Sequence, residues 1–360
     1  MTPSELSITA SGYSKASNAS NASDAADAAD AADAAESIPD SQETWRDGLR
    51  AGWRSLRRHA GTLMGLAALV LLFSLLSPAF LTGGNLRNVL LQVSIIAIVA
   101  FGMTYVLLLG EIDLSVGSVV ALAGSVAGLM LGQGLAPALV LPAVLLCGLL
   151  LGALNGSLSA LLHLPSFIVT VATMGIFRGL AYIVSGGMPA PVDNEAFLWI
   201  GNGEWLGMPV PIWILAALLA ANHFVLARTV FGRKTYLAGG NAEAATYAGI
   251  RVGRLKIAIF MLSGLMAAVG GLLLTSRLYS AQPNAAMGWE LDAIAAAVLG
   301  GTRLAGGHGS VAGTLIGALM IGVINNGMNL MSVPYFYQLI VKGSVILVAV
   351  CIDVHSRRRR

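Results

Sequence analysis

The sequence contains ten apolar stretches, most of them long enough for a helix to cross a bilayer, and this repetition constrains the fold more than any other feature. A transmembrane helix needs about 20 mostly apolar residues. The stretches are 61–80, 88–109, 115–132, 137–162, 165–185, 210–228, 254–276, 289–304, 310–331 and 335–353, of which 115–132 and 289–304 are the weakest. Charged residues make up only 11% of the chain, against about 25% in soluble domains. The pattern predicts an all-α, polytopic integral membrane protein with about ten transmembrane helices.

The two ends of the chain have a different composition. Residues 1–44 are polar and repetitive, and Asp stands at every third position of DAADAADAADAA, which leaves no face that a helix could bury. We expect this segment to be a disordered cytoplasmic tail. The other expected parts are a basic juxtamembrane segment at 45–60, a transmembrane domain at 61–353 and a basic cytoplasmic C-terminus at 354–360.

Lys and Arg are concentrated in three segments, and their positions predict the orientation. Arg residues precede position 61, Lys and Arg crowd the connection 228–256, and four Arg residues end the chain. The connection 186–208 contains neither residue. Because Lys and Arg in short loops favour the cytoplasmic side, ten spans place all three basic segments there. We therefore expect both termini to be cytoplasmic and 228–256 to be the largest cytoplasmic loop.

A faint internal repeat accompanies the apolar pattern. GEIDLSVGSVVALAG at 110–124 is echoed by GWELDAIAAAVLGG at 288–301, and GALNG at 152–156 by GALMIGVINNG at 317–327. The echoes are five spans apart, so the two halves would have opposite orientations. Inverted repeats are common in transporters, and the pattern predicts an inverted 5+5 repeat. Chance similarity between Gly- and Ala-rich segments is the alternative.

Four segments, in this order and spacing, resemble a known family. They are GEIDLSVGS at 110–118, LPSFIVTVATMGIFRGLAYIVSGG at 164–187, AGGNAEAATYAGI at 238–250 and GWELDAIAAAVLGGTRLAGGHGSVAGT at 288–314. Together they resemble the membrane permease subunits of bacterial ABC importers for monosaccharides, the ribose/xylose/arabinose-type permease family. The resemblance covers about residues 60–353.

The resemblance implies an activity and a set of partners. The chain would translocate a pentose or hexose across the cytoplasmic (inner) membrane by alternating access, as a homodimer in the lipid bilayer. Cytoplasmic ABC ATPase subunits and a periplasmic or extracellular sugar-binding protein would be its partners, and nucleic acid would not. No G-x-x-x-x-G-K-[ST] phosphate loop is present, so we expect ATP hydrolysis in a separate subunit. We expect no catalytic residues and no cofactor in this chain.

The segment GGNAEAATYAGI has features of a short capped helix. Asn241 is suited to cap a helix that runs through Ala248, and Gly249 is suited to close it. In the resembling permeases the matching segment is the coupling helix that docks on the ATPase. The resemblance therefore assigns ATPase coupling to Gly239, Gly240, Asn241, Glu243, Ala244, Ala245 and Gly249, with Glu243 as the polar anchor. The alternative is a basic loop that only sets the topology.

Polar residues inside or beside the apolar stretches are the candidates for the transport pathway, because sugar hydroxyls need hydrogen-bond donors and acceptors. The pathway candidates are Asp113, Ser115, Asn155, Thr170, Thr173, Asn325 and Asn326. A second group is expected to stabilise the fold: Glu111, Arg178, Glu290, Asp292 and Arg303. Its carboxylates would cap helix N-termini or pair with Arg178 and Arg303. Capping is an open alternative for Asp113 as well, and GEIDLSVGS is expected to break a helix.

Other functions remain open at this stage. An ion-coupled secondary transporter would use intramembrane carboxylates such as Asp113 or Glu290, but it has no need of GGNAEAA. Related ABC permeases for branched-chain amino acids share the general plan. The two cysteines, Cys147 and Cys351, lie in apolar stretches without metal-ligand spacing, so neither a disulfide nor a metal site is expected.

Overall fold

The computed structural model describes residues 60–358. The expectations for 1–44, and for all but the last residue of 45–60, concern residues outside this range. The helices are α3 (Gly83–Leu108), α4 (Val116–Gly132), α5 (Pro137–Leu161), α6 (Ser166–Val184), α7 (Glu195–Asn202), α8 (Val210–Arg228), α9 (Val230–Gly240), α10 (Ala242–Tyr247), α11 (Val252–Arg277), α12 (Trp289–Leu299), α13 (Val311–Leu330) and α14 (Tyr335–Arg358), preceded by helical residues Ala60–Leu76. The strands are β1 (Ala190–Pro191), β2 (Glu204–Trp205), β3 (Met208–Pro209) and β4 (Ser280–Ala281).

Every expected span contains a helix, although not every helix is long enough to span. Among the described residues, six helices are long and apolar enough to cross a membrane: α3, α5, α6, α8, α11 and α13. The helix α12 ends at Leu299, before Gly300 and Gly301 (φ +92°), so the expected span 289–304 was too long. At 1.5 Å per residue, its 11 residues reach about 16 Å, roughly half of the hydrocarbon core.

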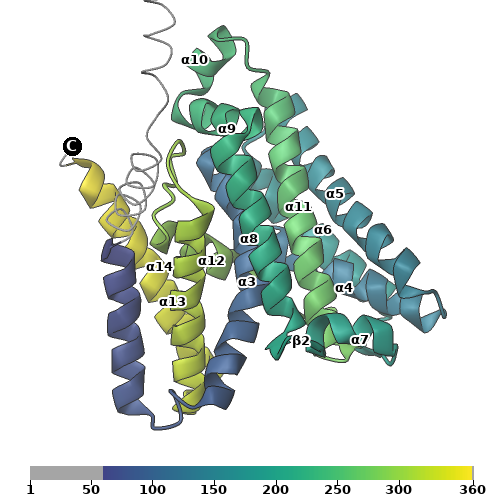
Figure 1. Cartoon of the computed structure of the whole chain (residues 1–360). Helices are drawn as coiled ribbons and strands as arrows, with labels where there is room; N and C mark the ends of the chain where they lie inside the picture. Colours follow the sequence, from purple (N-terminus) through teal and green to yellow (C-terminus); the bar gives the residue numbers. More distant parts are fainter. Residues whose placement is uncertain (1–59, 359–360) are drawn as a thin grey trace, which may run out of the picture. The chain divides into compact units, whose positions relative to one another are not determined.

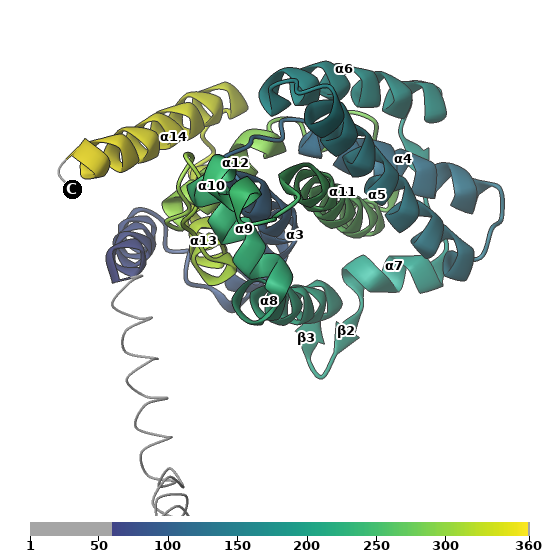
Figure 2. The same ribbon diagram turned by 90° about the horizontal axis from the view of Figure 1, so that it is seen from above.

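The helix α3 is the centre of the bundle. In its most apolar window 83% of the residues are buried, against 22% for α5 and α8. A helix that is apolar all round is expected inside a bundle, whereas half-exposed apolar helices face lipid. Viewed from above, α3 lies between α11 on one side and α13 on the other (Figure 2).

Glycines allow the helices α5 and α11 to pack at backbone distance. Gly148, Gly152 and Gly156 recur every four residues and face α11. A Cβ at Gly152 would overlap the carbonyl oxygen of Phe260, and one at Gly156 would lie 2.7 Å from the Cα of Ile257. Small residues at this spacing are typical of membrane helix interfaces, where apolar side chains gain little by leaving lipid.

The connection between α6 and α8 is fastened to the end of α11. Strand β1 pairs antiparallel with β4, which follows α11. The Ser276 hydroxyl donates to the carbonyl of Phe197 in α7 (2.9 Å), and it accepts from the Gly201 amide (2.8 Å). This region lies at one end of the bundle, and α9 and α10 lie at the opposite end (Figure 1).

The substitution Gly152→Ala is expected to destabilise the protein by about 1–3 kcal/mol, because the new methyl group forces α5 away from α11. The matched control is Gly179→Ala on α6, where a Cβ would meet no atom within 4 Å. Thermal unfolding in detergent, followed by circular dichroism, measures both. Equal losses in the two variants would contradict the close packing of α5 on α11.

Candidate functional site

GEIDLSVGS breaks the helix, as the sequence predicted. The helix α3 ends at Leu108, Gly110 adopts φ +78°, and α4 begins at Val116. Positive φ is strained for residues with a side chain, so Gly is suited to this turn. Ser115 occupies the N-cap position of α4, but its hydroxyl accepts no hydrogen bond from the amides of the first turn and instead donates to Asp113.

A buried polar network fixes this break. One carboxylate oxygen of Asp113 accepts from the Ser115 amide (3.0 Å) and the Ser115 hydroxyl (2.7 Å), and the other accepts from Ser263 of α11 (2.9 Å). The Asn155 amide of α5 donates to the Ser115 hydroxyl (2.8 Å). Asp113 is 2% exposed. These groups, which the sequence proposed for the pathway, are hydrogen-bonded mainly to one another and tie the break to α5 and α11.

The helix α6 holds the same loop from another side. The Ser166 hydroxyl accepts from the Ile112 amide (3.2 Å), and the Thr170 hydroxyl donates to the Ile112 carbonyl (3.3 Å). Thr173 donates to the carbonyl of Thr170 within α6 (3.3 Å). Both threonines are buried. Of these two pathway candidates, Thr170 therefore contacts the polar break, whereas Thr173 bonds within α6.

The charged groups pair differently from the expectation. Glu111 pairs with Lys256 of α11, and Asp292 pairs with Lys342 of α14 (2.9 Å), so their partners are lysines rather than Arg178 and Arg303. Glu290 and Asp292 both lie in the first turn of α12, where a negative charge is favoured. Arg178 donates to two backbone carbonyls ahead of α12 (2.9 and 2.7 Å), and its charge also interacts with that of Glu290.

Three backbone segments meet at the end of α3 nearest α9. The Gly307 amide donates to the Leu108 carbonyl (2.8 Å). A Cβ at Gly239, near the end of α9, would overlap that carbonyl, and one at Gly306 would lie 2.6 Å from the Gly239 carbonyl. We call Leu108, Gly239, Gly306 and Gly307 the glycine junction.

Side chains around the 300–309 loop hold it in place. Tyr236 of α9 donates to the Gly309 carbonyl (2.7 Å), and burial raises the pKa of its hydroxyl, which keeps the donor protonated. Arg303 is held through its backbone, where its amide donates to the His308 carbonyl (2.9 Å). The loop between α12 and α13 is therefore attached to both α3 and α9.

The predicted short capped helix is confirmed as α10. The Asn241 side chain accepts from the Ala244 amide (2.9 Å), the helix ends at Tyr247, and Gly249 follows at φ +80°. Ala245 is buried, whereas Glu243 is exposed and Tyr247 is 85% exposed. The residues on the exposed face are small apart from these two. Docking on a partner stays a prediction.

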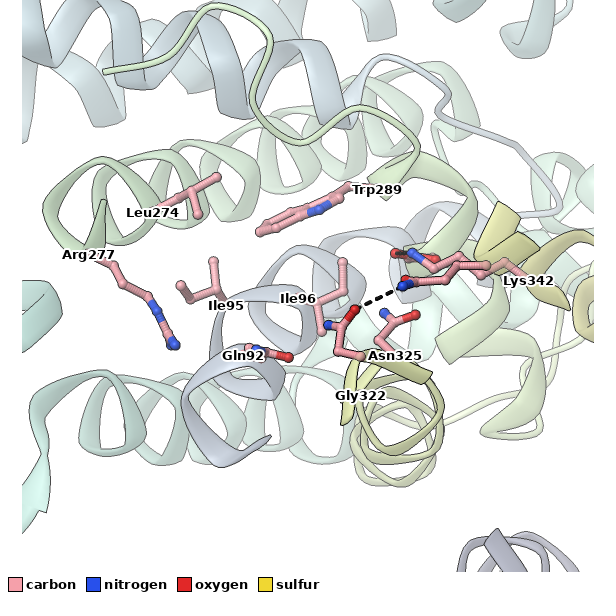
Figure 3. A pocket seen from close by; sticks show the side chains of 12 residues that line it. Gln92, Ile95, Ile96, Leu274, Arg277, Trp289, Gly322, Asn325 and Lys342 are labelled. Carbon is pink, nitrogen blue, oxygen red and sulfur yellow. Dashed lines mark hydrogen bonds and ion pairs between the residues drawn. The ribbon is translucent and has the colours of Figure 1, made fainter. Parts of the chain in front are cut away.

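A cavity of about 250 Å³ lies among α3, α11, α12, α13 and α14. Figure 3 shows the Trp289 ring beside it, with Arg277 and Asn325 toward different ends. Its polar lining comes from Gln92, Arg277, Trp289, Asp292, Asn325, Asn329, Gln338 and Lys342. Of the seven pathway candidates, only Asn325 lines it. Asn326 instead exchanges hydrogen bonds with Asn85 (2.9 and 2.8 Å).

Sequence reasoning missed several of these residues although a signal was present. Lys342 is the only Lys or Arg between Arg303 and Arg357, and Arg277 ends an apolar stretch. An isolated charge within an apolar stretch commonly marks a functional or paired position. Nothing in the sequence shows that Gln92 and Trp289, nearly two hundred residues apart, face one cavity.

Apolar helices of membrane-spanning length that enclose a polar break and a cavity are typical of a multi-pass membrane protein of the transporter class. The chain belongs to the family described as "Branched-chain amino acid transport system / permease component", which matches residues 85–350.

Named relatives within this class are import permeases for sugars. The chain is 48% identical over 81% of its length to the ribose import permease protein RbsC of Bacillus subtilis, of which 92% is covered. It is 44% identical to RbsC of Escherichia coli K12 over the same shares. It is 40% identical to the L-arabinose transport system permease protein AraH of E. coli K12, over 83% of this chain and 92% of AraH. No solved structure matches the chain.

The substitution Ser263→Ala is expected to destabilise the protein by about 1.5–3 kcal/mol, because a buried carboxylate oxygen loses a hydrogen bond. Asp113→Ala should lower the stability further, since it leaves the hydrogen-bond donors of Ser115 and Ser263 without their acceptor. The double variant should lose less than the sum of the two. Thermal unfolding in detergent measures this, with Ser185→Ala as an exposed hydroxyl control. Additive losses would contradict the network.

Proposed function

We propose that the protein is the permease subunit of an ABC importer that translocates a monosaccharide, a pentose or hexose, by alternating access. The observation that carries this proposal is the 48% identity to a ribose import permease, which extends over 81% of the chain. ATP is hydrolysed in a separate ATPase subunit, and the permease performs no covalent chemistry. The description of the wider family keeps branched-chain amino acids as the second candidate cargo.

The proposed architecture has ten spans in an inverted 5+5 repeat. In this scheme α3, α4 and α5 correspond to α11, α12 and α13. Reciprocal packing supports the correspondence: α4 and α5 pack on α11, while α12 and α13 pack on α3. A two-fold repeat would generate this exchange, with each half contributing a central helix to the other.

We propose that α9, α10 and both termini are cytoplasmic and that the opposite end of the bundle faces the periplasm or cell exterior. The basic residues of 228–256 support this orientation. The outer end would receive the sugar-binding protein on the region around α7, where Trp199 is 52% exposed. A second copy of the permease would complete the translocation unit in the inner membrane.

The proposed coupling path begins at α10. An ATPase that moves α10 also moves α9, whose Gly239 touches the end of α3 and the 300–309 loop without an intervening side chain. The helix α3 then extends from Leu108 to Gln92 at the cavity, about 24 Å at 1.5 Å per residue. Rigid helices and backbone contacts transmit displacement with little loss because packed interiors have low compressibility.

Uptake into proteoliposomes tests the proposed function. Purified permease, ATPase and binding protein are expected to import labelled D-ribose, L-arabinose or another monosaccharide only when all three proteins and ATP are present. Uptake of labelled leucine instead would favour the amino-acid candidate. Uptake that ignores the ATPase and follows an imposed proton or sodium gradient would make the protein a secondary transporter.

The substitution Glu243→Arg is expected to abolish co-purification of the ATPase, because it reverses the exposed charge on the docking helix. Asp193→Arg makes the same charge change at the opposite end of the bundle and should leave the association intact. Pull-down of the ATPase by tagged permease in detergent measures both. Normal ATPase recovery with Glu243→Arg would contradict the role of α10.

The substitution Gly239→Ala is expected to uncouple ATP hydrolysis from uptake, because the added methyl group separates α9 from α3. Gly175→Ala on α6 is the matched control, because a Cβ there would meet no atom within 4 Å and the residue lies outside the coupling segment. The ratio of sugar imported to ATP hydrolysed measures coupling. It should fall several-fold for Gly239→Ala only, and an unchanged ratio would exclude the glycine junction from the coupling path.

A further inference from the structure

Two buried polar atoms of the cavity have no hydrogen-bond partner in the part of the chain that the structure describes. They are Nη1 of Arg277 at the end of α11 and Oδ1 of Asn325 on α13. Buried polar atoms are almost always hydrogen-bonded, and an unmet one destabilises the fold by about 1–3 kcal/mol. Within the described residues, the cavity lining therefore offers one free hydrogen-bond donor, on Arg277, and one free acceptor, on Asn325.

The other polar groups of the lining are largely committed to one another. Lys342 donates to Asp292 (2.9 Å), and Gln338 donates to the side-chain oxygen of Asn329 (2.9 Å). Asp292 is the only carboxylate in the lining, and its charge is met by Lys342. An amino acid would need a free carboxylate for its ammonium group, whereas a neutral hydroxyl both donates and accepts. The free donor of Arg277 and the free acceptor of Asn325 therefore suit the hydroxyl groups of a sugar better than a zwitterionic amino acid.

The size and walls of the cavity fit a single sugar ring. Its volume of about 250 Å³ is below the range of roughly 300–1,000 Å³ typical of sites for drug-sized ligands. Trp289 supplies an aromatic face, and Ile95 and Ile96 supply apolar surface (Figure 3). An apolar and aromatic wall with a few placed polar groups is the usual composition of a small-molecule site.

The cavity also adjoins the region where cargo would arrive. Arg277 follows Ser276, and Ser276 is bonded to α7 through its hydroxyl and its carbonyl; the latter accepts from Asn202 (2.7 Å). Ser276, which contacts α7 at the proposed outer end of the bundle, is thus the residue before Arg277, whose guanidinium nitrogen Nη1 has no partner among the described residues.

We propose that this cavity holds the sugar during translocation, with the ring against Trp289 and its hydroxyls accepting from Arg277 and donating to Asn325. The assignment rests on the proposed function and adds its binding site. The contacts are few, and only one of them involves a charged group. A carrier that must release its cargo needs such modest affinity.

Uptake and ATP hydrolysis, measured in the same proteoliposomes, test this site. The variants are Arg277→Gln, Asn325→Ala and Trp289→Leu, with the exposed Gln133→Ala as the control. The probe is the labelled monosaccharide that the wild type imports, with D-ribose tried first. Each lost hydrogen bond should reduce uptake about threefold to tenfold, while ATP hydrolysis stimulated by the loaded binding protein stays near the wild-type rate. Gln133→Ala should match the wild type in both.

The possible outcomes distinguish a failure of the proposed binding site from a failure of the proposed function. Wild-type uptake with unchanged uptake in all three variants would overturn the site and leave the proposed function standing. A parallel fall of uptake and ATP hydrolysis in all three would also overturn it, since residues that only bind the cargo should leave ATP hydrolysis near the wild-type rate. An inactive wild type, with all partners present and every monosaccharide tried, would overturn the proposed function and with it the site.

Discussion

Direct contact between backbones is the constraint on which this structure depends. In lipid, apolar side chains gain little by leaving the membrane, so helices associate where their backbones approach closely. Gly152 brings α5 against α11, and Gly239 brings α9 against the end of α3. The first contact builds the bundle, and the second attaches α9 and the α10 helix that follows it to the bundle. A side chain at either position would force the two elements apart.

The polar break at 110–115 has a related role. Every backbone polar group inside a membrane needs a partner, so interrupting α3 and α4 creates unmet groups. The Asp113 carboxylate accepts from the Ser115 amide, and the Thr170 hydroxyl donates to the Ile112 carbonyl, so each satisfies a backbone group of the loop. The Asp113 carboxylate, which from the sequence alone suits either cargo binding or capping, is buried and accepts hydrogen bonds from Ser115 and Ser263 within this break. The loop lies next to the glycine junction because α3 ends at Leu108 and Gly110 is only two residues further along the chain.

The helix α3 links the glycine junction to the cavity. Gln92 contacts the cavity in one half of the helix, and Leu108 belongs to the glycine junction at its end. The helix α13 provides a second link, since the 300–309 loop precedes it and Asn325 lies toward its far end. Displacement at α9 would thus reach both walls of the cavity. Close burial of α3 makes it suited to act as a rigid connector.

The sequence by itself determined the class of the protein, the apolar stretches in which its long helices lie and the cap of α10. These are local properties: apolar length sets a helix in lipid, and Asn241 and Gly249 act within a few residues of themselves. It also foresaw the break at GEIDLSVGS. Only the tertiary structure decided which polar groups meet. It drew Asp113 and Asn155 into a buried network and paired Asp292 with Lys342. It also assembled a cavity from α3, α11, α12, α13 and α14, because helix rotation and depth depend on contacts far apart along the chain.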